Sequence, residues 1–210
     1  MGTLLNRRRY MGGGKGLPYD AEIQYIQSTG SQYIDTGFRP DADTSVKMKV
    51  LFPQQSAEIA LFDARNGPAE WTTSYGLINF TNSSNIVQMR YGGRKTMRAA
   101  LPCEVEYEIY MDKNELYIDG VYVNKSTTTT AQTTPNLVLF AMSRYYNNQI
   151  VINAGKPLRV YWCKIYDNGV LVRDFIPVRI EQVGALYDSV TQQIFYKGGS
   201  GNFTLGPDKT

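Results

Sequence analysis

The stretch EVEYEIYMDKNELYIDGVYV, residues 104–123, holds the clearest pattern in this chain of 210 residues. Apolar side chains occupy every second position of its first half, at Val105, Tyr107, Ile109 and Met111, and polar residues alternate with them. Successive side chains of a β-strand point to opposite faces of a sheet. The alternation therefore predicts a strand with one buried face and one solvated face, which carries the glutamates.

Two short turns follow this strand. Lys113 and Asn114 return the chain into a second apolar segment at 116–118. Asp119 and Gly120 come next, the residue pair favoured by type I′ hairpins, in which both central residues take a positive φ. The stretch as a whole predicts an antiparallel meander of three strands.

Similar short patterns recur along the chain. Further strands are predicted at 46–52, from 59, at 136–142 and on both sides of a turn at 167–169, the second of these ending at Pro177, with short strands near the C-terminus. Residues 126–134 read as a polar strand or a loop, and SRYYNNQ at 143–149 reads as a polar aromatic loop. No amphipathic helix is indicated. This spacing predicts an all-β sandwich or jelly roll.

The composition agrees with strands and tight turns, because the chain has sixteen Tyr, eight Phe and nineteen Gly. No apolar run approaches the roughly 20 residues of a membrane span. The N-terminus lacks the apolar segment of a secretory signal. We therefore expect no membrane contact and no signal peptide.

Residues 1–18 form a basic, Gly-rich arm, and residues 19–210 form the jelly-roll domain. The arm holds Arg7, Arg8, Arg9 and Lys15, which account for the whole net charge of +3. The rest of the chain is nearly neutral, which does not favour nucleic-acid binding.

The two cysteines, Cys103 and Cys163, lie sixty residues apart, each in phase with apolar neighbours. They are interpreted as two buried core residues, with a disulfide as the alternative. The chain has no histidine, and two isolated thiols do not make a zinc site. No metal and no cofactor are predicted.

The segment YIQSTGSQYIDTGF, residues 25–38, contains an Asp-Thr-Gly. An aspartic-protease site needs a second such carboxylate to share one proton, and no second Asp-Thr-Gly occurs in the chain. Asp, Thr and Gly also commonly end strands. Asp35 is therefore interpreted as a structural residue at the end of a strand.

Five motifs occur in a fixed order: YIQSTGSQYIDTGF, LFDARNG, ELYIDGVYV, KIYDNGVLVRDFIPVR and GALYDSVTQQIFYKGGSGNFTLGP. Over about residues 19–207 this order resembles the concanavalin A-like lectin/glucanase superfamily, and most of all the laminin-G-like modules of gut-bacterial surface proteins and phage virion proteins. The resemblance implies a jelly roll of two curved antiparallel sheets whose terminal segments lie close together. The fold alone does not select a function, since the superfamily includes glycosidases and non-catalytic modules.

The glycosidases of that superfamily carry a Glu-x-Asp-x-(x)-Glu strand. The match here is Glu104-x-Glu106-x-Glu108, which departs from it by a Glu in the middle position and has no neighbouring tryptophan. We interpret these acids as a solvated strand face and expect no enzymatic activity; a glycoside hydrolase is the third-ranked alternative.

Saccharide binding without catalysis needs aromatic platforms and a few polar groups. Two loop clusters are candidates, although each also fits ordinary loop aromatics or residues at subunit contacts. The candidate residues are Trp71, Tyr75, Tyr145, Tyr146, Asn147 and Asn148. The chain has no dense run of Asp and Asn residues that would indicate a calcium site.

The first interpretation of function is a non-enzymatic phage virion protein that displays the jelly roll on the virion surface. The arm would anchor it to other virion proteins, and the outward task would be glycan adhesion. The assembly residues of the arm would be Leu4, Leu5, Arg7, Arg8, Arg9, Tyr10 and Met11. The alternative is a bacterial surface or secreted carbohydrate-binding module, and homo-oligomers fit either.

Overall fold

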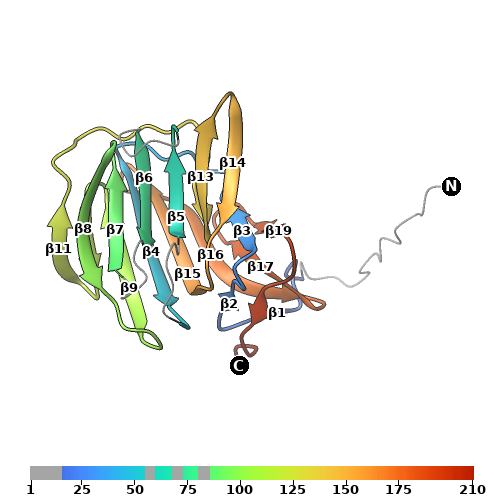
Figure 1. The fold of residues 1–210 in the computed structure, drawn as a ribbon. Coiled ribbons are helices and arrows are strands. Elements are labelled where there is room, and N and C mark those ends of the chain that lie inside the picture. Colours follow the sequence, from blue (N-terminus) through green and yellow to red (C-terminus); the bar gives the residue numbers. More distant parts are fainter. Residues whose placement is uncertain (1–15, 55–59, 68–72, 80–85) are drawn as a thin grey trace.

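The computed structural model describes residues 16–54, 60–67, 73–79 and 86–210. Within these ranges every regular element is a β-strand, and the strands form two sheets packed face to face as a jelly-roll sandwich (Figure 1). The all-β jelly roll predicted from the sequence is thus confirmed. The arm residues 1–15 lie outside the described ranges.

The first sheet is antiparallel. In spatial order its main strands are β11 (Val121–Lys125), β10 (Glu115–Ile118), β9 (Glu106–Asp112), β4 (Thr44–Leu51), β15 (Arg159–Asp167), β16 (Val170–Ile180), β17 (Val183–Asp188) and β18 (Gln193–Phe195). Three short strands join it: β1 (Ala21–Glu22) pairs with β16, and β2 (Ile26–Gln27) pairs with β15 and with β20 (Thr204–Leu205). The predicted meander is the β9-β10-β11 end of this sheet.

The second sheet lies over the first. Its spatial order is β19 (Gly198–Gly199), β3 (Gln32–Asp35), β12 (Val138–Leu139), β5 (Ala60–Arg65), β6 (Ser74–Asn79), β7 (Ile86–Tyr91) and β8 (Arg94–Ala100). The hairpin of β13 (Ala141–Tyr146) and β14 (Gln149–Ala154) joins this sheet through a parallel bridge between β13 and β5. Every other described pairing in the sheet is antiparallel.

The inward side chains of both sheets form one hydrophobic core. The first sheet contributes Val46, Met48, Val50, Tyr107, Ile109, Met111, Val160, Cys163 and Ile165. The second contributes Ile34, Phe62, Ala64, Tyr75, Leu77, Met89 and Tyr91. Each large aliphatic side chain buried here stabilises the fold by about 1.5–3 kcal/mol. The alternation of apolar and polar residues in the sequence therefore indicates which face of each strand is buried.

Two of the predicted turns are confirmed, the second with two residues between the strands in place of the three expected at 167–169. Asp119 and Gly120 have φ of 51° and 77° between β10 and β11, as a type I′ turn requires. Asn168 and Gly169 have φ of 47° and 78° between β15 and β16. These turns fix the register in which outward side chains of neighbouring strands meet.

The start of β9 differs from the prediction. Glu104 has a φ of 57° and its amide donates to the Phe52 carbonyl at 2.9 Å, so β9 begins only at Glu106. Val105 is consequently 44% exposed and does not face the core. Cys103 lies in the same turn and is half-buried, a correction to its predicted core position.

The other cysteine is a core residue, as expected. Cys163 is completely buried, and burial raises the pKa of its thiol. No disulfide joins Cys163 to Cys103. The side chain of Cys163 acts as a small apolar residue of β15.

Three other predicted boundaries move. The segment 143–149 is the β13–β14 hairpin and not a loop, because Asn147 and Asn148 form its turn with φ of 49° and 60°. The predicted strand 136–142 is divided at Phe140, which has a φ of 67°. β16 continues past Pro177, whose carbonyl accepts from the Ile23 amide at 3.0 Å. The proline's missing amide therefore faces away from β17, and that pairing is not interrupted.

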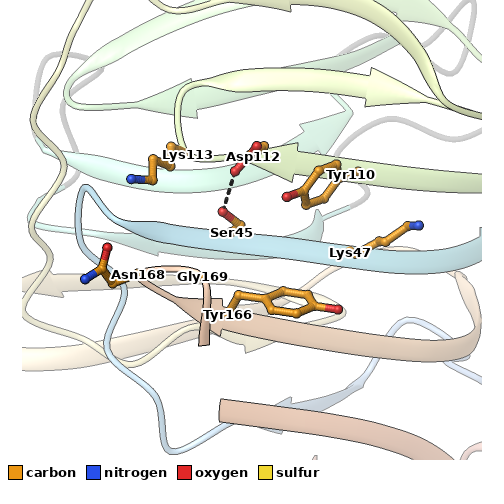
Figure 2. A pocket seen from close by; sticks show the side chains of 8 residues that line it. All are labelled: Ser45, Lys47, Tyr110, Asp112, Lys113, Tyr166, Asn168 and Gly169. Atoms are coloured by element: carbon orange, nitrogen blue, oxygen red, sulfur yellow. Dashed lines mark hydrogen bonds between the residues drawn. The ribbon is translucent and has the colours of Figure 1, made fainter. Parts of the chain in front are cut away.

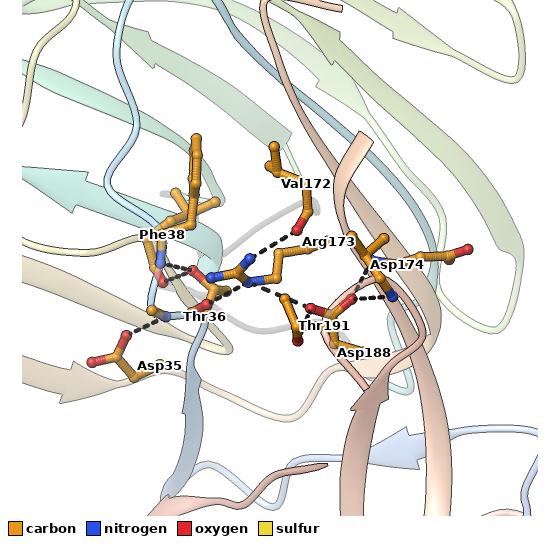
Figure 3. A network of polar contacts seen from close by, with 11 residues as sticks. Asp35, Thr36, Phe38, Val172, Arg173, Asp174, Asp188 and Thr191 are labelled. Carbon is orange, nitrogen blue, oxygen red and sulfur yellow. Dashed lines mark hydrogen bonds and ion pairs between the residues drawn. The ribbon is translucent and has the colours of Figure 1, made fainter. Parts of the chain in front are cut away.

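The Asp-Thr-Gly of residues 35–37 is part of a polar network between the sheets, shown in Figure 3. Asp35 Oδ1 accepts from the Gly37 amide at 2.9 Å, which closes a turn after β3. The Thr36 carbonyl accepts from Arg173 Nε at 3.1 Å, and Arg173 belongs to β16 of the first sheet. The motif thus ends a strand and joins the two sheets.

The other half of this network is built on Asp188, which is completely buried. Its carboxylate accepts from the Asp174 amide at 2.8 Å, the Val190 amide at 3.1 Å and the Thr191 hydroxyl at 2.6 Å. Arg173 Nε lies 3.7 Å from Asp188 Oδ2. These partners satisfy the buried carboxylate, so the network is structural.

The two ends of the domain lie side by side (Figure 1). Ile26 pairs with Leu205, and the Lys209 amide donates to the Glu22 carbonyl at 2.8 Å. This closeness of the terminal segments agrees with the jelly roll that the order of motifs implies.

Candidate functional site

The outer face of the first sheet consists of the side chains that alternate with the core residues of β9, β4 and β15. Core positions 46, 48 and 50 of β4 leave Ser45, Lys47 and Lys49 on this outer face. Register places Ser45 between Asp112 of β9 and Tyr166 of β15. Strand alternation and register together therefore bring residues from distant parts of the chain to one surface.

This outer face contains a shallow hollow of about 580 Å³ over β9, β4 and β15, shown in Figure 2. Its lining residues are Ser45, Lys47, Tyr110, Asp112, Lys113, Tyr166, Asn168 and Gly169. Small-molecule sites in proteins are commonly about 300–1,000 Å³. The hollow is thus large enough for one or two sugar rings in a partly open setting.

The rings of Tyr110 and Tyr166 lie on either side of β4 in Figure 2, with Ser45 between them. The Ser45 hydroxyl donates to Asp112 Oδ1 at 2.7 Å, which holds this carboxylate in the lining of the hollow. Asn168, in the β15–β16 turn, is exposed at the rim. The hollow therefore combines two aromatic rings with a carboxylate, a hydroxyl and an amide.

Burial raises the pKa of Tyr110, and the neighbouring Asp112 carboxylate raises it further. The phenol and the carboxylate therefore lie close enough to interact, with Ser45 beside both. A phenol beside a carboxylate offers several acceptor atoms to an incoming hydroxyl group.

The lysines on this face are paired with carboxylates. Lys47 Nζ lies 2.8 Å from Glu108 Oε1, and Lys49 Nζ lies 2.6 Å from Glu106 Oε2. At the rim, Lys113 Nζ lies 2.8 Å from Asp43 Oδ1. Because these ammonium groups have partners, the hollow has no strong preference for an anionic ligand.

These pairs also show where the predicted acid triad lies. Glu104 is outside β9, in a left-handed turn, so the three glutamates do not share one strand face as expected. The hydrogen bond from Lys49 lowers the pKa of Glu106, with a smaller contribution from Tyr161. A general acid needs a raised pKa, so Glu106 is poorly suited to that role.

A second aromatic group lies further along the same face. The guanidinium of Arg159 lies 4.0 Å from the centre of the Tyr25 ring, and Tyr161 meets Tyr25 edge to face at 5.7 Å. Tyr161 is at a register shift of β15, and Trp162, opposite Lys49, is half-buried. These contacts are packed against one another and do not line the hollow.

Of the first predicted cluster, only Tyr75 lies within the described residues. Trp71 lies outside the described residues. Tyr75 is completely buried in the core, and its hydroxyl donates to the Thr44 carbonyl at 3.0 Å. Burial raises its pKa well above the usual value. Tyr75 is therefore a core residue and not a loop contact, a correction to its predicted role.

The structure does bring the second predicted cluster together, at the tip of the β13–β14 hairpin of the other sheet. Tyr146 is 45% exposed there. The hydroxyl of half-buried Tyr145 donates to Asn148 Oδ1 at 3.2 Å, and Asn147 and Asn148 form the turn. Saccharide contact at this tip stays a prediction.

The prediction from sequence missed the hollow. Tyr110 occupies an outward position in residues 104–123. Tyr166 occupies an outward position in the predicted strand before the Asn168-Gly169 turn. The available sequence signal was an aromatic residue at an outward-facing position of a predicted strand. The local pattern could not show that β9, β4 and β15 are neighbours in the sheet.

Among the described residues, no group of three or more His, Cys, Asp or Glu side chains is placed to hold a metal ion. The described residues also contain no helix long and apolar enough to span a membrane.

Comparison with known proteins adds little beyond the fold. No family model matches the chain, and no curated protein matches it. A solved structure, the Ruminococcus gnavus IT-sialidase CBM40, is similar over 66% of this chain and 89% of that chain, with 10% identity and a TM-score of 0.42. A similarity this low carries no information about a ligand or a site in this chain.

Proposed function

We propose that this chain is a non-catalytic saccharide-binding module whose ligand occupies the hollow on the outer face of the first sheet. The observation that carries the proposal is the pair Tyr110 and Tyr166 on either side of β4, whose Ser45 holds the neighbouring Asp112 carboxylate. Aromatic faces pack against the C–H groups of a sugar ring, and carboxylate and amide groups bind its hydroxyls.

In this proposal each lining residue has a distinct task. The rings of Tyr110 and Tyr166 exclude water from the apolar face of the sugar. Asp112 accepts hydrogen bonds from its hydroxyls with the oxygen atoms that Ser45 leaves available, and Asn168 both donates and accepts at the rim. The paired lysines favour a neutral sugar, since an acidic sugar would have to compete with Glu108 and Asp43.

The test is binding of the full chain to a glycan array and to gels containing neutral polysaccharides. Tyr166→Ala should weaken binding at least about tenfold, because it removes an aromatic contact and exposes the sugar to water. Tyr196→Ala is the control, since Tyr196 is an exposed tyrosine that follows β18 and does not line the hollow. Binding that survives Tyr166→Ala and is lost on Tyr146→Ala would move the site to the β13–β14 hairpin.

We also propose that this module is displayed on a virion, as the sequence suggests. The alternative is a bacterial surface or secreted module. The support is the basic arm, residues 1–18, whose Arg7, Arg8 and Arg9 suit an acidic groove because guanidinium groups bind carboxylates in bidentate fashion. Deletion of residues 2–16 should leave the domain folded and its saccharide binding unchanged. Incorporation into the particle should fail; normal incorporation would contradict an anchoring arm.

A further inference from the structure

We propose that a row of three tyrosines, Tyr110, Tyr117 and Tyr122, extends the hollow into a groove-like surface for a linear neutral glycan chain that crosses the strands. This inference rests on the proposed saccharide binding and adds the ligand's form: several sugar units in a chain, not a single terminal sugar.

The row follows from the register of the β9-β10-β11 meander. Tyr110 of β9 is directly opposite Tyr117 of β10, which in turn is directly opposite Tyr122 of β11. The ring centres lie 6.0 Å apart in the first pair and 5.6 Å apart in the second. The row thus runs perpendicular to the strands, one aromatic ring per strand.

One end of this row is shared with the hollow, because Tyr110 lines it. The other end is at β11, the outermost main strand of the first sheet, where Tyr122 is 54% exposed. From β11 to β15 there are four strand intervals in the sheet order, so row and hollow together span roughly 19 Å at the usual spacing of about 4.8 Å. A chain of several sugar units fits this length, and it can leave the surface at the open end.

Glu115 positions the central ring. The Tyr117 hydroxyl donates to Glu115 Oε2 at 2.6 Å, and Lys125 Nζ lies 2.8 Å from Glu115 Oε1. The ring is therefore held in place before any ligand arrives, which reduces the entropy lost on binding. Because Lys125 is paired with Glu115, this part of the row also favours an uncharged chain.

If the three tyrosines have only a structural role, a different result is expected. Aromatic pairs on neighbouring strands stabilise sheets whether or not a ligand exists. If that were the whole role, removing Tyr117 would lower stability and leave the dependence of binding on chain length unchanged. The length of the ligand is therefore the variable that separates the two roles.

The experiment measures dissociation constants by calorimetry for disaccharides and hexasaccharides of linear β-1,4-glucan, β-1,3-glucan, β-1,4-xylan and β-1,4-mannan. We expect a hexasaccharide of at least one series to bind about tenfold more tightly than its disaccharide. Tyr117→Ala and Tyr122→Ala should each reduce this advantage about three- to tenfold and leave disaccharide binding unchanged. Tyr117→Phe should keep most of the advantage because it retains the ring.

Two failures are distinguishable. Equal binding of both lengths, or a Tyr117→Ala variant that keeps the hexasaccharide advantage of the Tyr196→Ala control, would overturn the row and leave the hollow as the site. No binding at either length, or binding indifferent to Tyr166→Ala, would overturn the proposed function and the row with it. Thermal unfolding of each variant confirms that the comparison is made between folded proteins.

Discussion

The buried carboxylate of Asp63 on β5 should make the stability of this protein fall as pH rises. Asp63 is completely buried, and the nearest guanidinium atoms of Arg90 and Arg65 lie 3.8 and 3.9 Å from it. Burial raises its pKa from 3.8 to about 6, and the two arginines only partly oppose this. The folded chain therefore binds this proton more tightly than the unfolded chain does.

A raised carboxyl pKa contributes stability that is fully present below the unfolded pKa and lost as pH rises through the folded pKa. The shift of about two pKa units corresponds to a total loss of about 3 kcal/mol, of which a little under half falls between pH 5 and pH 7. The chain has no histidine, so no imidazole titrates in this window.

The assay is urea unfolding of the wild type and Asp63→Asn at several pH values from 4 to 7.5. Asparagine has nearly the same shape and does not titrate, so the difference in unfolding free energy between the two proteins isolates Asp63. We expect the wild type to lose stability relative to Asp63→Asn as pH rises. A difference that stays constant, or that changes in favour of the wild type, would refute the argument from burial.

Three further predictions concern the fold. Arg173→Met removes the hydrogen bond to the Thr36 carbonyl between the sheets, and should lower the unfolding free energy by about 2–3 kcal/mol at unchanged urea m-value. Gly76→Ala places a Cβ 2.7 Å from Asp63 Oδ1, and should cost about 1–3 kcal/mol in the same assay, whereas no effect would mean that the strands can separate freely there. Asn148→Gly relieves a φ of 60°, which should outweigh the loss of the exposed hydrogen bond from the Tyr145 hydroxyl and raise the melting temperature slightly, by an equivalent of about 0.5 kcal/mol; a lower melting temperature would contradict it.

The sequence predicted the inward half of the fold well because burial acts strand by strand. Tyr107, Ile109 and Met111 alternate with polar residues, and all three are in the core. The prediction failed at Val105, because Glu104 starts the strand late by adopting a left-handed conformation. Positive φ at a residue other than Gly, Asn or Asp has no local sequence signal.

The candidate site could be predicted only in part, since it depends on neighbours that are remote in the chain. Tyr110 is visible as an outward aromatic residue in an alternating strand. Its partners at the hollow, Ser45 and Tyr166, come from strands more than fifty residues away on either side. Local periodicity reports which face a residue takes, and only the sheet order decides what it meets there.

The difference between the two sheets favours the first sheet as the proposed ligand surface. In β5 of the second sheet, Phe62 and Ala64 are in the core. The side chains of Asp63 and Arg65 therefore point to the opposite face of the sheet. Both are nevertheless buried, with 0% and 9% exposure, so that side of β5 is not open to a ligand. On the first sheet the outward residues include the half-exposed rings around the hollow and Tyr122 at the edge. A charged cluster sealed from water adds a pH-dependent cost to stability, whereas aromatic rings open to water gain free energy when a sugar covers them.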